Sequence, residues 1–240
     1  ADFFFRHLLD GDPASNTLGW RWVAGIQTPG KNYIARRSNI SKFTQNRFSP
    51  TGLAEDPEPL EYTEDRDRRE IPQLPASAEI LKEGRWGVLL TSEDLSPEVS
   101  PLANVQIEAI FAGLPRSLYQ NYNIAEPVRE FTRSALQDAL SRAENHWGAP
   151  SSGIVELDHL EKAVEDWAQE NQLDGIVSLA TPVGPWNDAL QSLLHSLRDK
   201  TLQFLQIRRT WDQELFPLAT RGFFPFKKQI PEIIDKMHLN

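Results

Sequence analysis

The segment Trp86-Gly-Val-Leu-Leu-Thr91 is a short apolar run of the kind that forms a strand buried on both faces of a sheet. Four further runs with strand character follow it, and helical patterns separate most of them. These runs are Val105-Gln-Ile-Glu-Ala-Ile-Phe111, Gly153 to Leu157, Ile176 to Ala180 and Leu202 to Ile207. Strands that alternate with helices favour an open parallel sheet. The sequence therefore predicts an α/β domain with an open parallel sheet of Rossmann-like type.

Apolar residues at helical spacing mark the helices between these strands. The first set predicts an amphipathic helix that ends near His146, and it comprises Val128, Phe131, Ala135, Leu136, Ala139, Leu140 and Ala143. A second helix is predicted from Leu157, Leu160, Val164, Trp167 and Ala168, and a third spans about Trp186 to Leu197.

A proline-rich, acidic stretch precedes the predicted sheet. Five prolines fall between Pro50 and Ala78, and eight acids with three arginines fall between Glu55 and Glu70. Such a composition buries too little apolar surface to order itself. We therefore predict three parts: a helical region at 1–50, a linker at 51–83 and the α/β domain at 84–240.

The stretch from Asp10 to Gly25 concentrates polar and aromatic side chains that could carry chemistry. Asp12 followed by Pro13 has the character of a helix start, and the helix is predicted to run to about Ala24. Asp12, Asn16 and Trp20 then lie in one row at i, i+4 and i+8, and Trp22 lies about 200° round from Trp20. Taken singly, these residues are also compatible with a cap, a surface amide and two core indoles.

The ordered string Asp-Gly-Asp-x-Ala-Ser-Asn-x-x-x-Trp-x-Trp-Val-Ala-Gly, from Asp10 to Gly25, resembles the flavin-contacting motif of the photolyase/cryptochrome family. The resemblance implies that 1–50 is the C-terminal part of a helical FAD-binding domain and that the chain is a fragment of a longer protein. More weakly, 91–102 and 222–228 resemble parts of the α/β antenna domain of photolyases, which usually precedes the flavin domain.

The resemblance also implies a role for each motif residue. Asp10 and Asp12 match acids that lie near the bound FAD, and Asn16 matches the residue beside flavin N5 that tunes its reduced states. Trp20 matches the indole nearest the flavin in the electron-transfer chain. Trp22 matches the tryptophan at the floor of the lesion pocket, where a flipped-out dimer stacks.

Two functions follow from this resemblance as expectations. The first is a flavin-dependent DNA photolyase, a lyase in which light-driven electron transfer from reduced FAD splits pyrimidine dimers in damaged DNA. The second is a cryptochrome-like blue-light photoreceptor, or a flavin-binding module without repair activity. An antenna chromophore is a further possible partner, and the fragment alone is expected to be inactive.

Charge bears on the DNA expectation in two ways. The net charge of −9 argues against general affinity for nucleic acid. Between Lys31 and Arg47, however, five basic residues occur with no acid, interleaved with Tyr33 and Phe43. This stretch has the composition to contact phosphates, or alternatively of a solvated loop and short helix.

Other chemistries find little support in the sequence. The chain has no cysteine, which excludes disulfides and thiolate-bound metals, and its five histidines lack ligand spacing. No Gly-rich phosphate loop of either common type is present. No run is long enough to span a membrane and no signal peptide is evident, so we expect a cytoplasmic protein without metal.

Overall fold

The structure is a computed structural model that describes residues 6–8, 34–54, 56–58, 74–81, 83–218 and 223–237. The chain divides into two compact units, Ala1–Arg69 and Glu70–Asn240. The division falls within the predicted linker at 51–83. In the first unit, the one described element of any length is the helix α3 (Arg37–Phe43).

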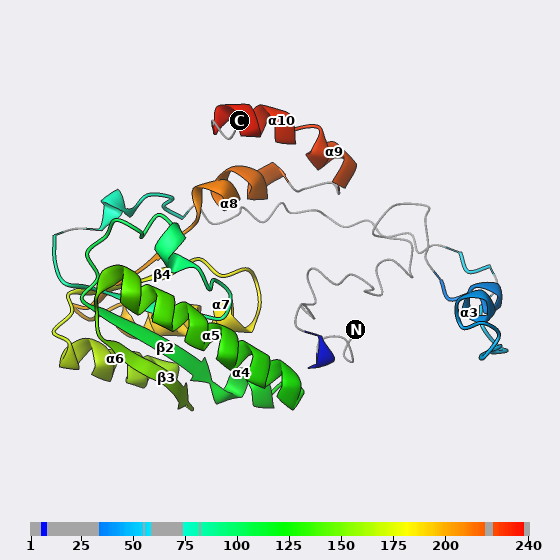
Figure 1. The fold of residues 1–240 in the computed structure, drawn as a ribbon, viewed down its shortest axis with the longest axis horizontal. Coiled ribbons are helices and arrows are strands. Elements are labelled where there is room, and N and C mark those ends of the chain that lie inside the picture. The colour runs from blue at the N-terminus through cyan, green and yellow to red at the C-terminus, as the bar shows by residue number, and fades with distance from the viewer. Residues whose placement is uncertain are drawn as a thin grey trace. The chain divides into compact units, whose positions relative to one another are not determined.

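The second unit contains a sheet of five parallel strands (Figure 1), which confirms the predicted α/β class and open parallel sheet. The strands are β1 (Trp86–Leu90), β2 (Ala109–Pro115), β3 (Ser151–Leu157), β4 (Gly175–Leu179) and β5 (Gln203–Ile207). Their order across the sheet is β3-β2-β1-β4-β5. The direction of strand addition therefore reverses at β1, between its neighbours β2 and β4.

Helices and short turns connect and follow these strands. The α-helices are α4 (Arg116–Gln120), α5 (Glu126–Trp147), α6 (Leu160–Glu170), α7 (Pro185–Leu197), α8 (Thr210–Leu215), α9 (Phe223–Lys227) and α10 (Ile230–Lys236). Three 3₁₀ turns are η1 (Ala78–Ile80), η2 (Pro97–Val99) and η3 (Phe216–Leu218). The predicted helices correspond to α5, α6 and α7.

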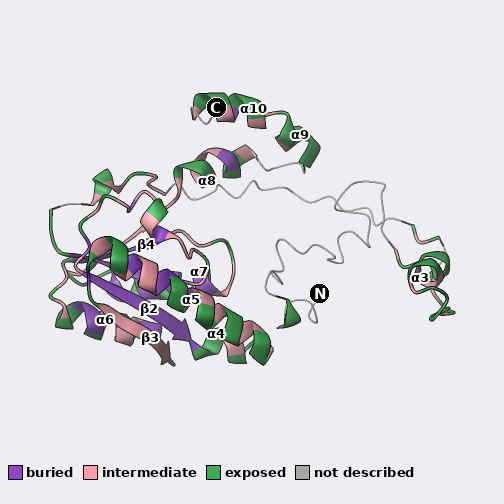
Figure 2. Ribbon diagram, viewed as in Figure 1, coloured by how far each residue is buried: buried purple, intermediate pink, exposed green. Residues whose placement is uncertain are grey.

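Each face of the sheet carries its own apolar core, because alternate strand residues point to opposite sides. Val88 and Leu90 pack with Leu136 and Leu140 of α5. On the other face, Leu89 packs with residues of α6 and α7. Figure 2 shows that β2 is buried, whereas β3 at the edge of the sheet is of intermediate burial and the helices are partly exposed. The fold is a three-layer sandwich.

Two glycines let tryptophan rings lie directly on the sheet. A Cβ on Gly175 of β4 would stand 2.4 Å from Cζ3 of Trp86, and a Cβ on Gly87 of β1 would stand 2.4 Å from Cη2 of Trp167. Both distances are far shorter than a carbon–carbon contact of about 3.5–4.0 Å. The absence of a side chain at each glycine therefore creates the seat for an indole.

The second strand lies later in the chain than predicted. The sequence pattern placed it at Val105 to Phe111, but β2 runs from Ala109 to Pro115 and all seven of its residues are buried. Ala112, Gly113 and Pro115 read as weak strand formers. They fit here because a strand with both faces covered favours close packing over intrinsic propensity.

Candidate functional site

The residues predicted to contact flavin or lesion fall in one stretch of the chain. Asp10, Asp12, Asn16, Trp20 and Trp22 all lie within residues 9–33, which are outside the described part of the structure. Their roles therefore stay predictions from the sequence. The neighbouring basic segment is described from Ile34 onward and provides the first candidate site.

The basic segment forms α3 and a turn that folds back beside it. Thr44 Oγ1 donates to the carbonyl of Ile40 at 2.7 Å and accepts from the backbone N–H of Phe48 at 3.2 Å. Gln45 and Asn46 have φ values of 52° and 64°, in the left-handed region used by tight turns. The reversal brings Arg37 Nε to within 2.8 Å of Ser49 Oγ.

Cations and aromatic rings cover this folded-back segment. None of the residues of α3 is buried, and the four basic side chains Arg36, Arg37, Lys42 and Arg47 are all exposed. Phe43 and Phe48 are 77% and 53% exposed. Lys42 Nζ lies 5.5 Å from the ring centre of Phe43, and Arg47 Cζ lies 5.2 Å from that of Phe48.

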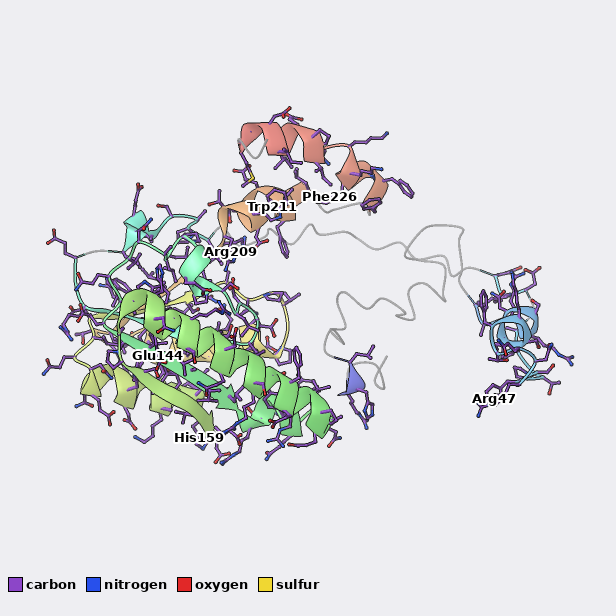
Figure 3. The ribbon with its side chains drawn as sticks, in the orientation of Figure 1. Arg47, Glu144, His159, Arg209, Trp211 and Phe226 are labelled. Atoms are coloured by element: carbon purple, nitrogen blue, oxygen red, sulfur yellow. The ribbon has the colours of Figure 1, made fainter. Side chains whose placement is uncertain are left out.

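The side chains of this surface are of the kinds that bind phosphate groups and stack on planar bases. Exposed guanidinium groups bind phosphate through paired N–H donors, and exposed phenyl rings stack on unpaired bases. A hollow of about 340 Å³ lies beside α3 and is lined by Arg36, Arg37, Pro50, Gly52 and neighbouring residues. Arg47, labelled in Figure 3, extends from the same segment. We call Arg36–Phe48 the basic aromatic segment.

The second candidate site is the edge where the parallel strands end. In open α/β sheets, ligands bind outside the carboxyl ends of the strands where the strand order reverses, here between β1 and β4. The indole N–H of Trp186, in the first turn of α7, donates to Ser92 Oγ at 2.7 Å. Trp186 is buried, and its hydrogen bond joins the loop after β1 to the helix after β4.

A second contact fixes the same loop to the end of β5. Arg209 donates to both carboxylate oxygens of Asp94 at 2.7 Å and to the carbonyl of Ser96 at 2.7 Å. The hydrogen bond to Asp94 raises the pKa of Arg209 above its ordinary value, although partial burial opposes this. Composition alone suggests a solvated face for Arg208-Arg209, whereas the Arg209 side chain is only 26% exposed.

An open groove lies beside Arg209. It has a volume of about 560 Å³ and is lined by residues of three segments, namely Ala76, Ser77, Ala78, Val99, Ser100, Pro101, Arg209, Thr210 and Trp211. The Trp211 ring is 41% exposed. Figure 3 labels Arg209 and Trp211 at the start of α8. The groove offers an indole face for a planar ligand.

The third cluster surrounds Glu156 at the end of β3. Arg133 Nη1 forms an ion pair with Glu156, and Arg116 and Arg129 each place a nitrogen 3.9 Å from it. Asp158 and Glu126 pair with Arg116 and Arg129 respectively, so acids balance the arginines. The sequence signal for this cluster is the i, i+4 spacing of Arg129 and Arg133; their partner on another element has no local signal.

Metal and membrane features are absent from the described ranges. Among these residues, no three His, Asp or Glu side chains come together in a way that could hold a metal ion. No described helix is long and apolar enough to cross a bilayer. Comparisons with protein-family models, with curated proteins and with solved structures gave no match.

Proposed function

We propose that this chain is part of a flavin-dependent DNA photolyase. The observation that carries the proposal is the exposed basic aromatic segment, which is separated from the end of the flavin-type motif Asp10–Gly25 by ten residues. One stretch would contact FAD and the next would contact the phosphates and bases of damaged DNA. Four cations without an acid distinguish this segment from a chain whose net charge is −9.

FAD, when bound, supplies the electron that light drives into a pyrimidine dimer. The protein's part is positioning and electrostatics. Asp10 and Asp12 would hold the cofactor, Asn16 would lie beside the flavin and Trp20 would conduct the electron that reduces it. Trp22 would stack on the extruded dimer, and stacking of a base on an aromatic ring contributes about 1–3 kcal/mol.

The first experiment measures flavin retention by the 240-residue chain. The chain is mixed with FAD, excess flavin is removed, and the absorption spectrum is recorded. Retained flavin bands that weaken in the Asp10→Ala/Asp12→Ala variant support the proposal. Retention that is equal in both proteins, or absent from both, contradicts a flavin-binding role for the motif in this chain.

A second experiment tests repair. Because the fragment alone is expected to be inactive, an oligonucleotide with one thymine dimer is illuminated with blue light in the presence of the flavin-loaded full-length parent, and dimer loss is followed by chromatography. Trp22→Ala is expected to abolish repair without loss of flavin, while Phe131→Ala, an exposed ring on α5, serves as the control. Repair that survives Trp22→Ala removes Trp22 from the lesion pocket.

A second candidate function is a cryptochrome-like photoreceptor or flavin module without repair. The net charge of −9 favours it, because a strongly acidic chain repels nucleic acid. In that case light reduces the flavin through Trp20, but dimers persist.

For either function, an antenna chromophore would lie in the groove beside Trp211, and the Trp211→Ala variant would release it.

A further inference from the structure

The C-terminal region, residues 208–240, carries a net charge opposite in sign to that of the whole chain. Residues 208–240 contain six Lys or Arg against four Asp or Glu, a net charge of +2, whereas the chain carries −9. Five aromatic residues occur in the same stretch, namely Trp211, Phe216, Phe223, Phe224 and Phe226. A cationic and aromatic region on an acidic protein indicates a binding partner that carries negative charge and planar aromatic groups.

Four of these aromatic residues, Trp211, Phe216, Phe223 and Phe224, are exposed. Phe223 and Phe224 of α9 are 61% and 78% exposed, and their ring centres lie 5.7 Å apart at an interplanar angle of 65°. Lys227 and Lys228 follow and are exposed, and the sequence has no acid between Phe216 and Pro231. We call Phe223–Lys228 the C-terminal aromatic segment. Figure 3 labels Phe226 within it.

The helices that flank this segment hold it in place. Lys236 of α10 forms an ion pair with Glu214 of α8, with Nζ 2.5 Å from Oε2. Ile233 of α10 and Leu215 of α8 are buried. Phe223 and Phe224, by contrast, are exposed, so burial does not explain these two adjacent phenyl rings.

We infer that the C-terminal aromatic segment binds single-stranded nucleic acid. Proteins that bind single strands combine aromatic rings, on which successive bases stack, with cations that follow the backbone. Phe223 and Phe224 provide two rings, and Lys227 and Lys228 provide two cations beside them. Pro225 limits the backbone between these pairs and so reduces the entropy lost when they become ordered.

The charge pattern favours a nucleic acid over a lipid surface. An interfacial membrane segment needs a broad apolar face or a large cationic cluster for stable binding, and this segment offers two strongly exposed rings and two lysines. A strand of unpaired bases uses each ring separately. The inference concerns the α/β unit and needs neither flavin nor light, so it stands apart from the proposed photolyase activity.

The test measures the affinity of the 240-residue chain for a fluorescein-labelled oligothymidylate by fluorescence anisotropy, in the dark. The background variant carries Gln at Arg36, Arg37, Lys42 and Arg47 and Ala at Phe43 and Phe48, so that the basic aromatic segment loses its four cations and two exposed rings. In this background, Phe223→Ala/Phe224→Ala is expected to raise Kd at least about tenfold, because each base stack is lost. Lys227→Gln/Lys228→Gln should make the negative slope of log K against log salt shallower by about 1.4.

Matched controls are Phe131→Ala on α5, whose ring is 54% exposed, and Lys162→Gln on α6. Both are expected to leave Kd and the salt slope unchanged. Equal affinity with and without the two phenylalanines overturns the inference. The inference is also overturned if the protein binds anionic phospholipid vesicles through Phe223 and Phe224 but does not bind the oligonucleotide. Neither result affects flavin retention or dimer repair.

Discussion

Arg209 and Asp94 form a two-nitrogen ion pair, in which Nε and Nη2 each lie 2.7 Å from a carboxylate oxygen. The pair joins the residue two positions beyond β5 to the loop that follows β1. Arg209 also donates to the backbone carbonyl of Val99, so one guanidinium fixes several points of that loop. The loop after β1 is therefore anchored in part by a side chain that follows the last strand in the sequence.

The Asp94→Asn variant tests how much this pair stabilises the domain. It keeps the side-chain shape but removes the charged acceptor, and we expect a loss of about 1–3 kcal/mol in the free energy of unfolding. Urea unfolding followed by circular dichroism measures it. Asp166→Asn removes an acid from an exposed pair on α6 and is the control, expected to leave the urea midpoint unchanged. Equal midpoints for the two variants would contradict the prediction.

The hydrogen bond from Trp186 to Ser92 predicts coupling between two residues 94 positions apart. A double-mutant cycle with Trp186→Phe, Ser92→Ala and the combined variant isolates this contact. We expect a coupling free energy of about 0.5–1.5 kcal/mol, the usual net contribution of one hydrogen bond. Strictly additive losses of stability would show that the two side chains are not energetically coupled.

The Trp86 ring lies directly over Gly175, so we predict that even one methyl group added at position 175 destabilises the domain. Gly175→Ala places a carbon 2.4 Å from the indole, which is rigid, so the ring or the strand must shift. Overpacking of this kind costs about 1–3 kcal/mol, and the melting temperature should fall. In the Gly175→Ala background, Trp86→Phe should lower the free energy of unfolding by less than Trp86→Phe does in the parent protein. A melting temperature unchanged by Gly175→Ala would refute the predicted clash.

Tyr119 predicts a pH dependence on the alkaline side. Burial raises the pKa of the Tyr119 hydroxyl above 10.0, while a hydrogen bond to Thr132 and the charge of Arg129 lower it to a smaller extent. Because the pKa of Tyr119 is higher in the folded protein than in the unfolded chain, the stabilising contribution of the protonated hydroxyl is fully present below the unfolded-state pKa. It is lost as pH rises through the folded pKa.

Tyr119→Phe should therefore lose less stability than the parent protein between about pH 9 and about pH 11. Urea midpoints at the two pH values provide the comparison. Absorbance at the tyrosinate band should also show one of the four tyrosines titrating late in the parent and not in the variant. A late step that persists in Tyr119→Phe would assign it to another tyrosine.

The sheet could be predicted from the sequence because its signals are local. Trp86–Leu90 is a continuous apolar run, and the helical spacing of Leu136, Leu140 and Ala143 identifies the buried face of α5. The position of β2 could not be predicted, since Gly113 and Pro115 have low strand propensity. Their place in the sheet depends on β1 and β3 on either side, which is a tertiary effect.

The candidate sites divide in the same way. The cations and rings of the basic aromatic segment are visible in the sequence, and the structure adds that none of the residues of α3 is buried. The pairing of Arg209 with Asp94, by contrast, joins residues 115 positions apart, and no local pattern signals it. Asp10, Asp12, Asn16, Trp20 and Trp22 lie outside the described residues, so their geometry stays a prediction.

The ion pair at the carboxyl edge also bears on how the domain is assembled during synthesis. The connection from β1 to β2 contains no α-helix, and the loop it forms is fastened by Arg209, which is translated more than a hundred residues later. Contacts between distant residues form late because a long loop must close first. On the ribosome, the first crossover of the sheet is therefore held in stages: Arg142 of α5 can donate to the carbonyl of Leu95 early, and the contacts of Arg209 are added only after β5 has been made.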